Sequence, residues 1–136
     1  MMLRKSILLF VFLLAAQASG LAQKCLSYEP AEVRLRGRVS RQTFPGPPNY
    51  ENIKKGDKPE TYWVLHLDTP ICVAASADND AESGVTDLQL ILSPGELTRF
   101  KSFVRRRLSV RIVGRLSHAI TGHHHTPVLL EVKGFN

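Results

Sequence analysis

Two segments far apart in the chain share one pattern, in which apolar residues alternate with arginines around an internal glycine. Residues 33–39 read V-R-L-R-G-R-V, and residues 110–116 read V-R-I-V-G-R-L. Alternation with a period of two predicts strands that bury one face. A glycine weakens a flat strand, so it is usual where a strand bends sharply or bulges. Two long, bent strands indicate a small closed barrel.

The segments between and after these two strands supply the other elements. Strands are expected at residues 62–68, 86–92 and 127–134, with residues 71–74 continuing the sheet after an interruption at Pro70. Ser93 and Glu96 have the spacing of a capping box, which predicts that a helix begins there. Its apolar face, expected to plug the barrel, consists of Leu97, Phe100, Phe103, Val104 and Leu108.

This order of elements predicts a mainly β protein, a small OB-fold-like five-stranded barrel with one amphipathic helix between strands three and four. A β-sandwich is the alternative, and the single central helix disfavours it. About 114 residues follow the N-terminal apolar segment, which is the size of one domain. We therefore expect a single OB-like domain over residues 23–136.

The N-terminal segment has the features of a secretory signal peptide. Arg4 and Lys5 precede an apolar run over residues 7–16, which is shorter than the roughly 20 residues that span a bilayer. Small residues suited to signal peptidase follow, and cuts after residues 18, 20 and 22 all fit. We predict a signal peptide over residues 1–22, export from the cytoplasm, and no transmembrane segment after its removal.

The exported domain is mildly basic. Removing Arg4 and Lys5 lowers the formal net charge from +6 to +4. Its strand arginines could attract anions, but single-strand binding also needs aromatic side chains on which bases stack, and most aromatics here occupy predicted core positions. We expect a solvated charged face and no nucleic-acid partner. The strand arginines are Arg34, Arg36, Arg38, Arg41, Arg111 and Arg115.

The two cysteines, Cys25 and Cys72, lie outside any Cys-x-x-Cys redox spacing. In an oxidising compartment they most simply pair with each other, although two buried free thiols are the alternative. The expected disulfide would tie the N-terminal tail to the barrel and stabilise the fold by roughly 2–4 kcal/mol.

Four of the five histidines fall between residues 118 and 125, in the predicted loop before the last strand. In OB-folds this loop and the one between strands one and two flank the ligand-binding face. Imidazoles are ligands for Zn²⁺ or Cu²⁺, so a transition-metal site is one hypothesis. A structural role and a pH response near the ordinary histidine pKa of about 6.5 are the alternatives. The candidate ligands are His123, His125, His124, His118 and His66.

A second unusual loop covers residues 43–60 and is rich in proline and glycine. Long connections in small domains are commonly functional or disordered, and the prolines and aromatics favour order here. Tyr50, Asp57 and Glu60 are its candidate ligand- or partner-contacting residues.

No motif for catalysis is present: there is no nucleophile elbow and no H-E-x-x-H. We expect an exported binding or interaction module for a small ligand, a metal ion or another exported protein, more readily than an enzyme. An inhibitor or immunity-like protein that covers an exported partner is the alternative, and a metal-dependent hydrolase is the third hypothesis.

Several stretches together resemble one protein family. They are P-G-P-P-N-Y at 45–50, G-D-x-P-E at 56–60, Trp63, P-I-C-V at 70–73 and T-G-H-H-H-T-P-V-L-L at 121–130. This pattern resembles an uncharacterised exported bacterial family, the domain-of-unknown-function family 4431, over nearly all of the exported chain. The resemblance implies a bacterial, periplasmic setting and no particular activity.

Overall fold

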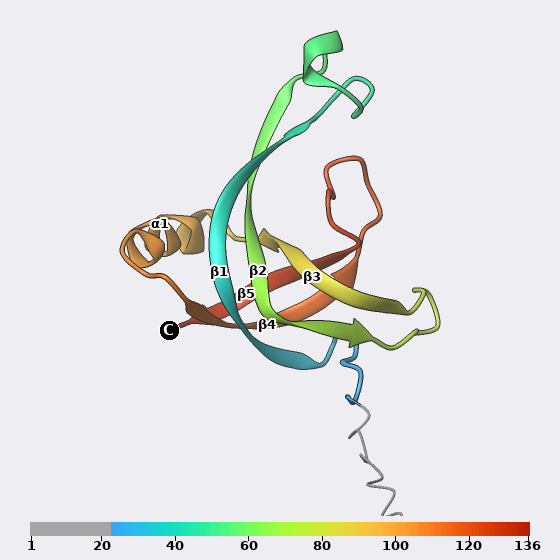
Figure 1. The fold of residues 1–136 in the computed structure, drawn as a ribbon, viewed down its shortest axis with the longest axis vertical. Helices are drawn as coiled ribbons and strands as arrows, with labels where there is room; N and C mark the ends of the chain where they lie inside the picture. Colours follow the sequence, from blue (N-terminus) through green and yellow to red (C-terminus); the bar gives the residue numbers. More distant parts are fainter. Residues whose placement is uncertain (1–22) are drawn as a thin grey trace, which may run out of the picture.

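The computed structural model describes residues 23–136, and the predicted signal peptide lies outside this range. The strands close into a barrel in the order β1-β2-β3-β5-β4, with β1 also paired to β4 (Figure 1). Among the strands of residues 23–136, the pair β3 and β5 is parallel and the other pairs are antiparallel. The predicted OB-like barrel with one helix between strands three and four is confirmed. The elements are β1 (Glu32–Pro45), η1 (Ile53–Lys55), β2 (Pro59–Val73), β3 (Glu82–Ile91), α1 (Pro94–Val104), β4 (Val110–His118) and β5 (Val128–Phe135).

The two strand glycines lie where neighbouring strands approach too closely for a side chain. A Cβ atom on Gly37 would stand 2.0 Å from the carbonyl oxygen of His66, and one on Gly114 would stand 2.3 Å from that of Glu131. The β4–β5 register also shifts beside Gly114, as expected for a bulge. These glycines therefore let β1 and β4 curve against β2 and β5 to close the barrel.

Helix α1 covers the barrel through one fully buried aromatic. Phe100 has 0% exposure, and its ring packs edge-on against Trp63 and Phe135 at centroid distances of 5.7 and 5.2 Å. The predicted capping box is present, because Ser93 accepts from the Glu96 N–H and Glu96 accepts from the Ser93 N–H. The helical start and its plugging role are confirmed.

The prediction that Leu108 belongs to the buried helix face is wrong. Helix α1 ends at Val104, and Leu108 is 90% exposed. The chain has only residues 105–109 in which to turn from the helix into β4, so Leu108 lies in this connection and not on the helix. None of the helices in the described residues is long and apolar enough to span a membrane.

The predicted disulfide between Cys25 and Cys72 is present. Backbone hydrogen bonds from Leu26 N–H to the Cys72 carbonyl and from Ala74 N–H to the Leu26 carbonyl, both 2.8 Å, accompany it. The tail is thus tied to the end of β2. Pro70 does not end that strand, since β2 continues to Val73 through shifts of register.

Strands β1 and β2 are longer than their sequence patterns predicted. Residues at both ends of the predicted loop 43–60 are paired, from Phe44 with Glu60 to Pro45 with Pro59. The result is a two-stranded arm, residues 43–60, that projects beyond the barrel (Figure 1).

Candidate functional site

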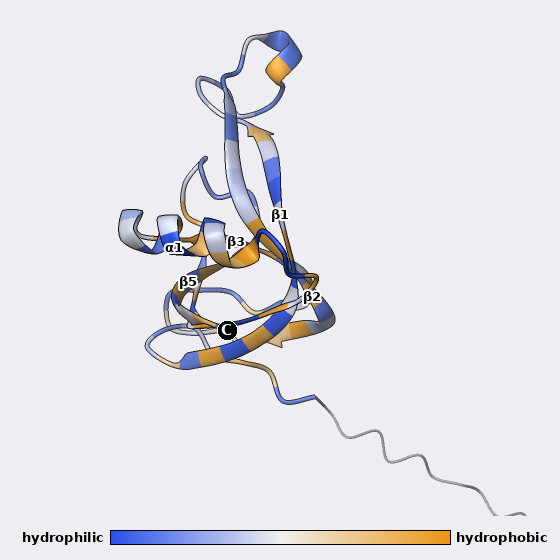
Figure 2. Cartoon of the chain, turned by 90° about the vertical axis from the view of Figure 1, so that its left-hand side faces the viewer, coloured by the Kyte–Doolittle hydropathy of each residue, from blue (hydrophilic) through white to orange (hydrophobic). Residues whose placement is uncertain are grey.

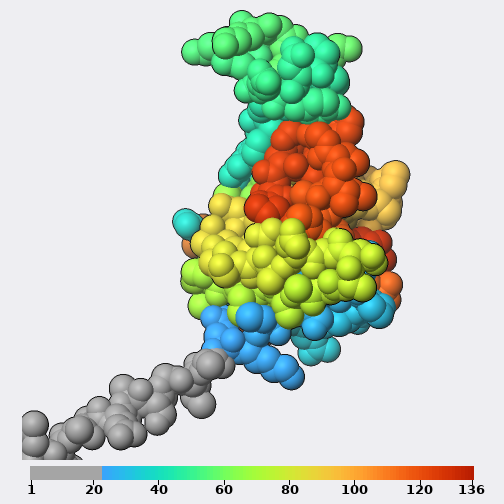
Figure 3. All heavy atoms as spheres, turned by 90° about the vertical axis from the view of Figure 1, so that its right-hand side faces the viewer, coloured from blue at the N-terminus to red at the C-terminus, as the bar shows by residue number. Residues whose placement is uncertain are grey.

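The arm adjoins the histidine loop, which we define as residues 119–127 between β4 and β5. Figure 3 shows this loop (orange-red) directly beneath the tip of the arm (green). The two loops predicted to flank the ligand-binding face therefore meet on one side of the molecule.

Glu60 and His123 make the main polar contact between arm and loop. His123 Nδ1 lies 2.9 Å from each Glu60 carboxylate oxygen, and the Tyr50 hydroxyl lies 3.2 Å from His123 Nε2. The hydrogen bond from His123 lowers the pKa of Glu60 below its ordinary value. The Tyr50 ring fits against Gly122, where a Cβ atom would come within 2.9 Å of it. Tyr50 and Glu60 thus hold the loop to the arm.

His125 is packed as an aromatic ring. It stacks on Phe44 with centroids 4.4 Å apart and planes 2° apart, and it lies 5.5 Å from the Tyr62 ring. Its side chain is only 10% exposed, and Nε2 is buried without a hydrogen-bond partner, 3.6 Å from Glu60. Stacking therefore sets its orientation.

Gln89 on β3 holds the backbone of the histidine loop. Its side-chain amide donates to the His123 carbonyl at 3.0 Å, and its side-chain oxygen accepts from the His125 N–H at 2.8 Å. The Gln89 N–H donates to the Thr126 hydroxyl at 2.8 Å. Gln89 forms one row with Val64 and Leu129 across three strands. Each is at most 2% exposed, and all three lie outside the main hydrophobic cluster of the barrel. The histidine loop thus covers this row from outside.

Asp57 organises the tip of the arm through backbone hydrogen bonds to its carboxylate. It is 4% exposed, and its carboxylate accepts from the backbone N–H groups of Asn49, Glu51 and Asn52 at 2.8–2.9 Å. These backbone hydrogen bonds, led by that of Asn52, lower the pKa of Asp57. Asp57 therefore has a structural role inside the arm, and a contact between Asp57 and a partner stays a prediction.

The order of the arm tip should therefore depend on pH through Asp57. Because the carboxyl pKa is lowered on folding, its stabilising effect is complete above the ordinary value of about 4 and is lost as pH falls through the folded-state pKa. We expect the amide resonances of Asn49, Glu51 and Asn52 to move together in an acid NMR titration. Asp57→Asn should lack this transition; its persistence in that variant would assign it to another group, such as Glu60.

The other three histidines, His118, His124 and His66, each contact different groups from those that His123 and His125 contact. His118 Nε2 lies 3.0 Å from Glu82, and this hydrogen bond raises the pKa of His118. His124 Nδ1 accepts from the Ile120 N–H at 3.0 Å, and burial lowers the pKa of His124. His66 on β2 contacts Asp87 and Ser40.

The five histidines consequently do not assemble into one site. Within residues 23–136, no group of three or more His, Cys, Asp and Glu side chains has an arrangement that could hold a metal ion. The hypothesised transition-metal site is not found there, because carboxylates, aromatic rings and backbone groups engage the histidines separately.

Three strands place a second polar group on the outer face of the barrel. His66 and Asp87 are direct cross-strand partners, and Ser40 lies diagonally across on β1. His66 Nδ1 is 2.6 Å from Asp87 Oδ1, and His66 Nε2 is 2.7 Å from Ser40 Oγ. Sequence reasoning missed Ser40, Asp87 and Gln89. The only signal available for Gln89 was a polar residue within the apolar run of β3.

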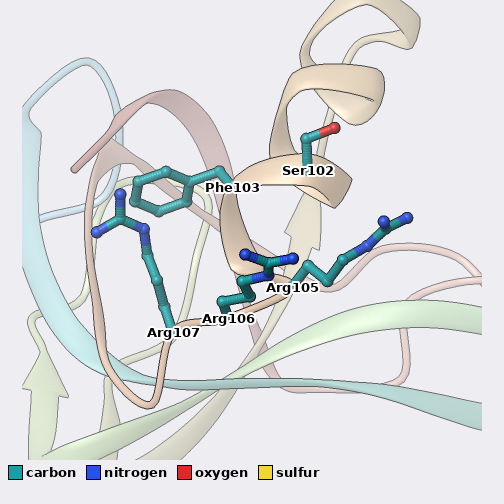
Figure 4. Close-up of a pocket in the computed structure, with 5 residues that line it drawn as sticks. All are labelled: Ser102, Phe103, Arg105, Arg106 and Arg107. Carbon is teal, nitrogen blue, oxygen red and sulfur yellow. The ribbon is translucent and has the colours of Figure 1, made fainter.

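A basic pocket lies at the end of α1, on the other side of the barrel from the histidine loop (Figure 1). Its volume is about 510 Å³, and Arg107 lies 4.0 Å from the centre of the Phe103 ring (Figure 4). Its lining contains none of the predicted site residues. They are Ser102, Phe103, Arg105, Arg106 and Arg107.

Part of the chain matches a protein-family model. The family model DUF4431, Domain of unknown function, matches residues 87–134. No curated protein matches the chain. The matched range includes α1, β4 and the histidine loop, whereas the arm residues that contributed to the resemblance lie outside it. Residues 87–134 of this small β-barrel protein thus match DUF4431, and the resemblance to that family is confirmed over this part of the chain.

Proposed function

We propose that this chain is an exported interaction module that binds another exported protein through the tip of its arm and the adjoining histidine loop. The signal-peptide pattern of residues 1–22 supports export. The observation that carries the binding role is the projecting arm, whose tip is held by Asp57 and whose base is held to the histidine loop by Tyr50 and Glu60. A loop preorganised in this way loses little conformational entropy on binding.

The surface of the arm and loop offers the kind of contacts that protein interfaces use. Ile53 at the tip is 40% exposed, and Ile120 in the histidine loop is 80% exposed. Figure 2 shows a hydrophobic spot at the tip of an otherwise largely hydrophilic arm. Lys54, Lys55 and Lys58, near Ile53 in the chain, are exposed and add positive charge to the tip. The complementary partner surface is an apolar recess with an acidic rim.

The test compares two exposed apolar residues. Ile53→Asp should weaken binding at least about tenfold, because losing a buried interface anchor costs about 2 kcal/mol or more and each 1.4 kcal/mol is about a factor of ten in affinity. Leu108→Asp, in the connection between α1 and β4, should bind as the wild type does. The partner would be captured from the extracytoplasmic fraction of the source cells with immobilised protein, identified, purified and then titrated by calorimetry.

Equal affinity of the two variants would contradict this proposal. Stoichiometric Zn²⁺ or Cu²⁺ in the wild type, lost in His123→Ala/His125→Ala, would favour a metal-binding function instead. Elemental analysis of the tag-free protein makes that measurement independently of any partner.

A further inference from the structure

Ser40, His66 and Asp87 form a continuous hydrogen-bonded relay across three neighbouring strands. The two distances, 2.6 Å from Asp87 to His66 Nδ1 and 2.7 Å from His66 Nε2 to Ser40 Oγ, are both short. All three side chains come from paired positions in the barrel wall, so the strands themselves fix their relative placement.

The partners of the two ring nitrogens of His66 indicate which nitrogen carries the hydrogen. An ionised Asp87 can only accept, so in the neutral imidazole Nδ1 carries the hydrogen and Nε2 is left as an acceptor. Gln42 agrees with this assignment, because its side-chain amide nitrogen lies 3.3 Å from the same Nε2. The Ser40 hydroxyl therefore donates to an unprotonated imidazole nitrogen, which is the arrangement that activates a serine as a nucleophile.

The relay is accessible from solvent. The side chains of His66 and Asp87 are 29% and 48% exposed, and Ser40 is half-buried. The outer row that contains Ser40 continues through Val64 to Gln89, under the histidine loop. A reactive group carried on an extended molecule could thus lie across β1–β3 and reach Ser40.

We propose that Ser40 is a nucleophile toward accessible carboxylic esters, with His66 as its general base and Asp87 as the positioning residue. Ser40 Oγ forms a bond to the acyl carbon as its proton passes to His66 Nε2. The tetrahedral centre collapses, the ester C–O bond breaks, and the leaving alkoxide takes that proton as an alcohol. Water then attacks the acyl-serine with the same base, which releases a carboxylic acid and regenerates Ser40.

Gln42 lies beside the proposed nucleophile and its base. Its amide donor and Ser40 Oγ both approach the same His66 nitrogen, at 3.3 and 2.7 Å. A side-chain amide beside the attacked carbonyl can donate to the oxyanion as negative charge develops. The substrate class is an O-acyl ester displayed on an extended chain, because the relay lies on the outer barrel wall. This inference goes beyond the proposed interaction function and does not depend on the arm.

The test uses a fluorophosphonate, which phosphonylates an activated serine with loss of fluoride, and p-nitrophenyl acetate as an ester. We expect a single adduct on Ser40 by intact mass and peptide mapping, and none in Ser40→Ala. His66→Gln should slow labelling at least about 100-fold. Ser102→Ala, which removes an exposed hydroxyl on α1, should label as the wild type does.

Asp87→Asn separates positioning from a merely structural role. The asparagine amide can donate to Nδ1, so the ¹⁵N signals of His66 should show the hydrogen moved to Nε2 while labelling falls. Absence of a Ser40 adduct in the folded wild type, or equal labelling after denaturation, would overturn the proposal. Circular dichroism of each variant establishes that the barrel remains folded.

Discussion

Replacing Phe100 with alanine should destabilise the protein by about 3–5 kcal/mol, the largest single effect expected in the described domain. Phe100 is fully buried and joins α1 to both Trp63 and Phe135. Removing its ring loses these contacts and leaves a cavity that the strand-held neighbours cannot readily fill. Urea unfolding followed by circular dichroism measures the change in the free energy of unfolding.

A variant in the connection between α1 and β4 provides the control for Phe100→Ala. Leu108→Ala removes an apolar side chain that is 90% exposed, so its effect should stay within about 0.5 kcal/mol. Comparable losses in the two variants would mean that α1 does not plug the barrel through Phe100.

Replacing Gln89 with methionine should cost at least about 2 kcal/mol, although the side-chain volume is nearly kept. Methionine has no amide, so the His123 carbonyl loses its hydrogen-bond donor and the His125 N–H loses its acceptor. Each buried polar group left unpaired costs about 1–3 kcal/mol. Hydrogen exchange should report a local effect as well, with faster exchange at the His125 amide.

The Ala119 amide supplies the internal reference for this experiment. It donates to the Pro127 carbonyl at 3.0 Å and makes no contact with Gln89, so its exchange should change less than that of His125. Unchanged protection at His125 would show that the loop does not rely on Gln89. Loss of protection there would make Gln89 the residue that fastens the loop to β3.

The arm shows where sequence reasoning stopped short. Prolines and glycines correctly marked residues 43–60 as a special segment, and Tyr50 and Glu60 do contact the histidine loop. Asp57 looked equally available in the sequence, but it lies inside the tip and accepts backbone hydrogen bonds. The residues around a carboxylate in the sequence do not distinguish one that binds a partner from one that holds a turn.

The sequence by itself determined the barrel and its single helix, because period-two alternation and the capping box are local patterns of the chain. The pairing of Cys25 with Cys72 followed from the number of cysteines, since an exported chain with two cysteines has one possible disulfide. Only the tertiary structure decided what the polar residues do. Strand register placed His66 beside Ser40 and Asp87, and brought Gln89 under the histidine loop. These contacts join residues far apart in the chain, and closure of the barrel fixes them in space.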